Sequence, residues 1–315
     1  MLYRIVVRTG VFAASLVGAS VVVFAFMAVL PGDPARVALG VNATPAAVAQ
    51  LQKEFGTDRA LTARYLDWVG GLAVGDFGRS YVTHEAIGPQ VVDRLGVTLW
   101  LVGSAMVVAL VLAVPLGTVM ALRHRQLSGL ALSAMSQLGI AVPAFLGGIL
   151  AVAFFSVRLG WLPSGGWVAP AESPVEFVRH LVLPVAALGV AQAAVLARYV
   201  RSAILDVLRE DYLRTARAKG LTPGRALVRH GFRNAAIPVA TVLGLQLATL
   251  LVGAIVIERV FVIPGLGSLL LDGVANRDLL LVQGVVMVIV VVVLIVNYVV
   301  DLCYTALDPR LRVSP

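Results

Sequence analysis

The sequence has little charge and almost no cysteine. Only 13% of its 315 residues are charged, and Cys303 is the single cysteine, so neither an intramolecular disulfide nor a cysteine metal cluster is expected. The four histidines, which lie in separate hydrophilic segments without metal-ligand spacing, do not predict a metal site. These are His84, His124, His180 and His230.

Two catalytic patterns are also missing. No G-x-x-x-x-G-K-[ST] phosphate loop occurs, because "GLTPGRA" at 220–226 lacks the Lys-Ser/Thr pair, so the chain is not expected to hydrolyse ATP. No serine stands in a G-x-S-x-G turn, and the carboxylates are scattered. We therefore expect a protein that is not itself an enzyme.

What the sequence does contain is long apolar runs. The chain is 59% hydrophobic with a mean hydropathy of +0.93, which indicates a membrane protein. Runs of about 20 residues without charge are long enough to cross roughly 30 Å of hydrocarbon. The fold class predicted is all-α, one transmembrane domain over residues 1–315. Its six spans are expected near 9–30, 95–122, 131–157, 181–204, 236–257 and 280–302.

The distribution of lysine and arginine predicts the orientation. An even number of spans puts both termini on one side, together with the 123–130 and 198–235 connections. Fifteen of the 25 cations fall on that side, nine of them between Arg198 and Arg233. Six of the other ten lie in the long 31–94 segment, interleaved with acidic residues, and long segments weigh little in the positive-inside rule. Cytoplasmic termini in a bacterial plasma membrane are therefore predicted.

The hydrophilic segment 31–94 is predicted to be an extracytoplasmic insertion with its own short helices. "ATPAAVAQLQKEFG" begins with a Thr-Pro helix start and ends with a Gly stop, and "ALTARYLDWVGGLA" repeats the helical pattern. Two or three short amphipathic helices are expected there.

The segment 206–235 contains more helix-capping signals than a passive connection requires. Asp206, Glu210 and Asp211 stand in the expected early turns of one helix, Arg217 and Lys219 in its last turn, and Gly220 at its end. One apolar face is predicted for that helix. It consists of Ile204, Val207, Leu208, Tyr212 and Ala216.

A second helix is expected after the Gly220 turn. Thr222 is its predicted N-cap and Pro223 its first residue. Arg225, Arg229 and Arg233 then form a basic stripe, and Val228, Phe232 and Ala236 an apolar one, which suits a helix lying on an anionic bilayer surface. The alternative is that the loop only carries positive-inside charge, with no docking role.

Several segments resemble the dipeptide/oligopeptide/nickel branch of ABC-importer permeases. "DYLRTARAKGL" (211–221) with "RHGFRNAAIPV" (229–239) is similar to the cytoplasmic coupling loop of that family. "LPGDPARVALG", "FGTDRALTARYLDWVGGLAVGDFGRS", "ERVFVIPGLGSLLLDGV" and "YTALDPRLR" also resemble it, in the same order along nearly the whole chain. Ala216 and Gly220 match the general E-A-A-x-x-x-G pattern, whereas Arg214 and Thr215 replace its Glu and first Ala.

The resemblance implies a type I ABC importer permease fold with a helix-turn-helix between the fourth and fifth spans. It implies a second, homologous permease subunit, two ABC ATPases that use ATP and Mg²⁺, and an extracytoplasmic binding protein that delivers peptides. No cofactor is expected on this chain. The resemblance also implies which residues contact an ATPase: Arg214, Thr215, Ala216, Arg217, Ala218, Lys219, Gly220 and Leu221.

The spans hold few polar groups and almost no ionisable ones, which argues against a secondary transporter coupled through buried carboxylates. That alternative would also show inverted repeats. The pathway candidates are amides and hydroxyls of the fourth and fifth spans, namely Gln192, Thr241, Gln246 and Thr249. Hydrogen bonding between helices is the competing role for each. Dipeptides, oligopeptides, glutathione and nickel chelates all remain open as substrates.

Overall fold

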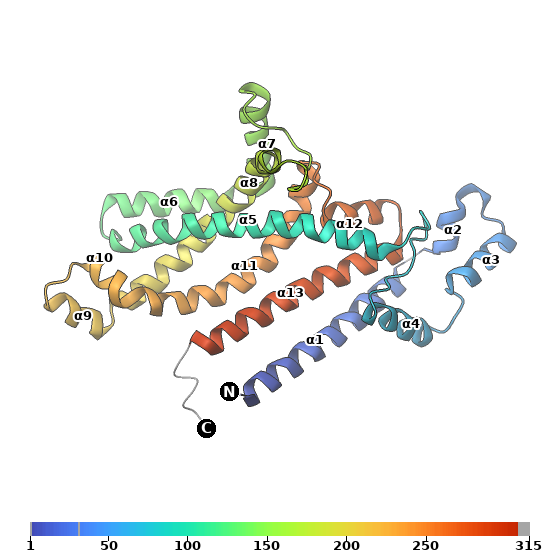
Figure 1. Ribbon diagram of the computed structural model, residues 1–315, viewed down its shortest axis with the longest axis horizontal. Coiled ribbons are helices and arrows are strands. Elements are labelled where there is room, and N and C mark those ends of the chain that lie inside the picture. Colours follow the sequence, from blue (N-terminus) through green and yellow to red (C-terminus); the bar gives the residue numbers. More distant parts are fainter. Residues whose placement is uncertain (1, 31, 308–315) are drawn as a thin grey trace. The chain divides into compact units, whose positions relative to one another are not determined.

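The computed structural model describes residues 2–30 and 32–307, without the side chains of 2–5, 42 and 303–307. Over these residues the chain is helical, and its only β contact is an isolated bridge between Arg79 and Ala86. The chain divides into two compact units (Figure 1). The central unit holds Leu99–Ile263 and the chain from Val296, and the N-terminal unit holds Leu2–Thr98 and Pro264–Ile295.

Five helices among the described residues are long and apolar enough to cross a membrane, or six if one bent pair is counted as a single span. Four belong to α1 (Leu2–Val29), α5 (Ile87–Leu122), α8 (Pro174–Leu208) and α13 (Leu279–Leu307). The fifth runs without interruption from Pro223 to Val260, through α10 (Pro223–Ala226), the π-helical segment η3 (Leu227–Gly231) and α11 (Phe232–Val260). Most of these helices extend past the apolar runs that predicted them.

The third predicted span, 131–157, is not one helix. It consists of α6 (Leu127–Ala141), α7 (Ala144–Ala151) and the π-helical segment η2 (Val152–Arg158), with a bend of 91° after α6. Pro143 explains the break, because it has no N–H to donate and disfavours helical backbone at the preceding residue, and Val142 is extended at φ −87°, ψ 119°. Pro115 and Pro184, by contrast, lie inside the continuous helices α5 and α8.

Helix α8 forms the middle of the central unit. It starts with Ser173, whose Oγ accepts a hydrogen bond from the Glu176 N–H, and Pro174 follows at the first helical position. Its buried residues occur along the whole helix, from Phe177 to Val207, and it packs mainly against α11, α6 and α7. A helix buried on several sides serves as the core of the unit.

The N-terminal unit contains three short helices within 31–94: α2 (Pro34–Leu39), α3 (Pro45–Phe55) and α4 (Leu61–Ala73). The start and stop predicted for α3 are confirmed, since Thr44 Oγ1 accepts from the Ala47 N–H and Gly56 is left-handed at φ +66°. A further helix, α12 (Leu266–Ala275), precedes α13.

Two apolar clusters hold this unit together. One joins the start of α5 with α12 and α13, through residues such as Ile87, Leu266 and Val285. The other joins α1, α4 and α13 through Val23, Trp68 and Met287. Of the short helices, α4 and α12 are therefore packed on the long ones.

Candidate coupling site

The segment 206–235, which we call the coupling loop, begins with a break between two helices that the sequence did not reveal. Helix α8 ends at Leu208, Glu210 is extended, and α9 (Asp211–Ala218) begins after it. Asp206 therefore lies in the last turn of α8, so the prediction that it opens the loop helix was wrong. The predicted apolar face is divided between two helices, and Leu213 rather than the exposed Tyr212 is the buried residue of α9.

The turn after α9 agrees with the prediction. Gly220 has φ +93°, a conformation that L side chains rarely adopt, and its N–H donates to the Arg217 carbonyl at 2.9 Å. The Leu221 N–H donates to the Ala216 carbonyl at 3.3 Å. Thr222 caps the next helix by accepting from the Arg225 N–H at 3.4 Å, with Pro223 at the first helical position.

The second helix buries a different face from the predicted one. Val228 is 68% exposed, whereas Leu227, Gly231 and Ala235 are buried. The buried residues have the same spacing of four as the predicted ones and lie one position earlier in the chain. Of the predicted apolar stripe, Phe232 is half-buried and packs against the buried residues of the loop, whereas Val228 and Ala236 are exposed.

The loop packs on protein at its base. One buried cluster joins α5, α8, α9 and the helix that begins at Pro223, and Figure 1 shows α9 and α10 together at one end of α8 and α11. Leu213 and Leu227 are fully buried in it. The cluster is Ala121, Val200, Ala203, Ile204, Val207, Leu213, Ala226, Leu227 and Ala235. Full burial of one leucine stabilises by about 1.5–3 kcal/mol, so the loop is rigidly attached to the ends of the long helices.

Gly231 permits this close packing. A Cβ added there would lie 2.7 Å from Leu227 Cδ1 and 3.1 Å from Val207 Cγ1, which leaves no room for it. Near it, Asn234 Nδ2 donates to the Tyr212 hydroxyl at 2.8 Å and ties α9 to α11. Sequence reasoning missed Gly231 and Leu213, although a glycine between charged residues in "RHGFRN" is a usable signal.

The residues predicted to contact an ATPase occupy the outside of this structure. Six of the eight are exposed: Arg214, Thr215, Arg217, Ala218, Lys219 and Gly220. Ala216 and Leu221 are half-buried and pack against the cluster beneath. Arg214 lies 3.4 Å from Asp211, an exposed ion pair that contributes little stability. The outer surface of the loop is thus basic and exposed.

The four predicted pathway residues do not form one surface. Thr241 and Thr249 are exposed on α11, and their hydroxyls donate to the carbonyls of Ile237 and Leu245. Gln192 and Gln246 are buried, and Gln192 Nε2 has no hydrogen-bond partner among the described residues. Only the two threonines therefore face outward in this conformation.

Long apolar helices with an ordered, exposed loop fixed to their ends define a class: a multi-pass α-helical membrane protein. Comparison with known proteins makes the class specific. Residues 113–313 match the family described as binding-protein-dependent transport system inner membrane component, and residues 1–102 match the N-terminal region of such components. The chain belongs to this family.

Relatives and solved structures agree with the assignment. The di/tripeptide transport system permease protein DppB of Pseudomonas aeruginosa is 38% identical over 333 residues, covering 99% of each chain. The glutathione transport system permease protein GsiC of Escherichia coli K12 is 40% identical over 294 residues, covering 93% of each. The fold resembles a chain of the MetNI methionine ABC transporter, with a TM-score of 0.60 at 18% identity over 70% of this chain and 96% of that one.

The ABC-importer permease fold expected from the sequence is thus confirmed, and the chain is a multi-pass permease subunit of an inner membrane. It is not a stand-alone transporter. The expected ATPase contacts and pathway residues remain predictions.

Proposed function

We propose that this permease passes short peptides across the membrane after an extracytoplasmic binding protein delivers them. The support is the full-length similarity to permeases named for di/tripeptide and for glutathione transport. The few polar groups in the predicted spans agree with a route that accepts varied side chains and leaves selection to the binding protein.

We propose further that the chain pairs with a homologous permease and that two ATPase subunits, using ATP and Mg²⁺, drive the pair. The coupling loop and both termini face the cytoplasm in this arrangement, and 31–94 faces the outside. The distribution of lysine and arginine supports that orientation.

One observation carries the coupling role: the exposed turn at Gly220 lies on a fully buried apolar base. Leu213 and Leu227 fix that base to α5, α8 and α11. An ATPase that displaced the exposed tip would therefore move the ends of three long helices together, because packed interiors transmit displacement. The basic residues Arg214, Arg217 and Lys219 suit an acidic cleft on such a partner.

For the pathway we propose Thr241 and Thr249, because they are the exposed members of the predicted set. Leu245, 67% exposed, lies between them on α11. Gln192 and Gln246, both buried, are placed behind this surface.

Reconstitution tests the function. The permease pair, its ATPases and the binding protein are placed in proteoliposomes, and uptake of a labelled dipeptide is followed with and without ATP. Uptake that needs ATP, the ATPases and the binding protein is expected. Uptake of the dipeptide by this chain alone would contradict the proposal, and so would a complete complex that transports other solutes but no peptide.

A further inference from the structure

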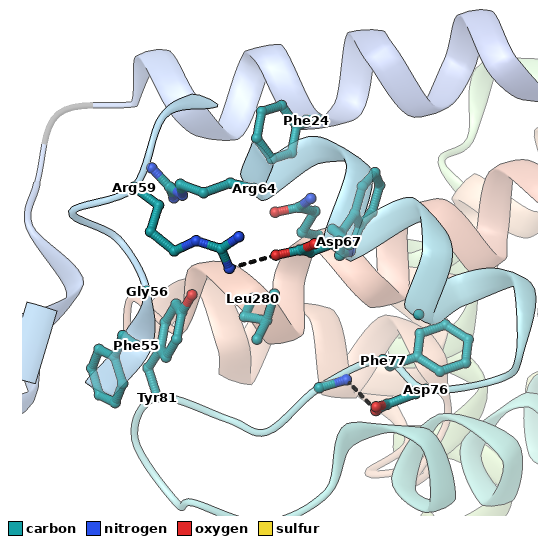
Figure 2. Close-up of a pocket in the computed structure, with 14 residues that line it drawn as sticks. Phe24, Phe55, Gly56, Arg59, Arg64, Asp67, Asp76, Phe77, Tyr81 and Leu280 are labelled. Atoms are coloured by element: carbon teal, nitrogen blue, oxygen red, sulfur yellow. Dashed lines mark hydrogen bonds and ion pairs between the residues drawn. The ribbon is translucent and has the colours of Figure 1, made fainter. Parts of the chain in front are cut away.

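The N-terminal unit contains a pocket of about 240 Å³ that the transport role does not use. Its lining comes from distant parts of the chain: Phe24 of α1, residues 55–81 around α3 and α4, and Leu280 and Gln283 of α13. Figure 2 shows Arg59, Arg64, Asp67 and Tyr81 around it. The volume is below the ~300–1,000 Å³ of sites for drug-sized ligands, so the pocket has the size for a metabolite no larger than an amino acid.

Hydrogen-bond donors without partners are concentrated in this lining. Trp68 and Gln283 are 9% and 7% exposed, and neither Trp68 Nε1 nor Gln283 Nε2 has a hydrogen-bond partner within the described part of the chain. The guanidinium of the half-buried Arg64 likewise forms no hydrogen bond or ion pair with any described residue. Leaving a buried donor unsatisfied costs about 1–3 kcal/mol, but the Trp68 and Gln283 nitrogens have almost no accessible surface, so the group of this lining that is available to a ligand is the Arg64 guanidinium.

One oxygen of each carboxylate in the lining is already engaged. Asp67 Oδ2 pairs with Arg59 Nη1 at 2.5 Å, and Asp76 Oδ1 accepts from the Gly78 N–H at 2.9 Å. Burial raises the pKa of Tyr81 above its usual 10, opposed by Arg64 and assisted by Asp278, so its phenol remains protonated at neutral pH. Arg64 is thus the one cation of the lining without a carboxylate, and it lacks an anionic partner.

Aromatic rings form the rest of the walls. Phe55 and Tyr81 stack with centroids 4.4 Å apart, and Phe24 lies 6.0 Å from Trp68. Phe77 also lines the pocket. Such walls favour a ligand with a flat or apolar body over a bare inorganic anion.

The loop that carries Tyr81 is held firmly. The Ser80 hydroxyl donates to Asp278 Oδ2, and the Tyr81 N–H donates to Asp278 Oδ1 at 3.3 Å. Asp278 is buried at the start of α13, and the Leu281 N–H donates to the same Oδ1. The pocket is therefore preformed, which lowers the conformational entropy lost when a ligand binds.

We propose that this pocket binds a small organic carboxylate with an apolar or aromatic body, of the size of a free amino acid. Its carboxylate would pair with the guanidinium of Arg64, and its body would lie against Phe55 and Tyr81. The site is separate in its residues from the coupling loop and from Thr241 and Thr249, and the inference does not depend on peptides being the transported substrate.

The test uses the purified complex in detergent, without the binding protein and without ATP, and measures equilibrium binding of tritiated L-phenylalanine. Saturable binding is expected, and L-phenylalaninamide, which lacks the carboxylate, should compete poorly. Arg64→Met should weaken binding by at least roughly tenfold, as for the loss of a charge-assisted hydrogen bond. Arg36→Met is the matched control, since Arg36 is exposed in α2 outside the pocket, and it should bind as the wild type does.

The melting temperature of the Arg64→Met complex should match that of the wild type, which confirms folding. Absence of saturable phenylalanine binding, equal binding of the amide, or unchanged binding by Arg64→Met would overturn the proposal. Competition by phosphatidylglycerol but not by phosphatidylcholine would do so too, because it would show a lipid headgroup in the pocket. Loss of peptide uptake with binding intact would count against the proposed function alone.

Discussion

The coupling loop and the pocket of the N-terminal unit are both built from short helices, yet they bury opposite kinds of groups. The loop buries leucine and alanine and leaves its cations exposed. The residues that line the pocket include an indole and an amide whose buried nitrogens have no partner among the described residues. Apolar burial gives a rigid element that can transmit force, whereas unsatisfied polar burial costs stability.

The largest effect is expected for Leu213→Ala, which removes a fully buried side chain from the loop base. Such a truncation costs about 2–5 kcal/mol, so α9 should detach locally. Limited trypsin digestion should then cut at Arg217 and Lys219 much faster than in the wild type. Val228→Ala, at a 68% exposed position of the same loop, is the control, and equal cleavage of both variants would show that the loop is not held by its apolar base.

Gly231→Ala is expected to have the second-largest effect. The added methyl group must displace Leu227 Cδ1, 2.7 Å away, and overpacking of this kind costs about 1–3 kcal/mol. A lower unfolding temperature of the complex and faster cleavage of the loop are expected. If the variant is as stable as the wild type, the close approach of α8, α9 and η3 described above is incorrect.

Gly220→Val tests the exposed turn with its packing left intact. No atom lies within 4 Å of an added Cβ, so the cost arises from the backbone at φ +93° and should be about 1–2 kcal/mol. We expect normal membrane insertion and reduced peptide uptake per ATP hydrolysed. Gly224→Ala is the matched control, because its Cβ meets only Leu122 Cδ1 at 4.0 Å, and uptake equal to wild type in both variants would remove the coupling role.

The smallest expected effect is an increase in stability rather than a decrease. Gln283→Met replaces a buried amide without a partner at Nε2 by an apolar side chain of similar length, which should stabilise the unliganded protein by about 1 kcal/mol. Thermal unfolding in detergent measures the change, with Gln50→Met at an exposed position of α3 as the control. A clear loss of stability would show that the Gln283 amide has a structural partner, and the contrast between the two regions would fail.

The features that the sequence predicted well are local. The start and stop of α3 at Thr44 and Gly56, and the turn from Gly220 to Pro223, depend on residues within a few positions of each other. Long apolar runs are equally easy to recognise in the sequence, because a helix must be long and apolar to cross a bilayer. The resemblance to permeases added the family, which the comparisons confirm.

The features that the sequence did not reveal depend on backbone geometry or distant contacts. The buried face of the second loop helix, with Leu227, Gly231 and Ala235, lies one position from the predicted one, because packing against distant parts of the chain selects the face. The break before α9 divides a face that looked continuous. The pocket unites Phe24, Arg64 and Gln283, which are far apart in the chain and carry no motif.

Cross-linking of the loop tip tests the central claim most directly. Lys219→Cys in a Cys303→Ser background leaves one cysteine in the chain, at an exposed position of the loop. A photoreactive maleimide attached there in membranes of the whole complex is predicted to cross-link to an ATPase subunit, and an impermeant maleimide should not label intact cells. Labelling of intact cells from outside would contradict the account, because the loop would then face away from the ATPases.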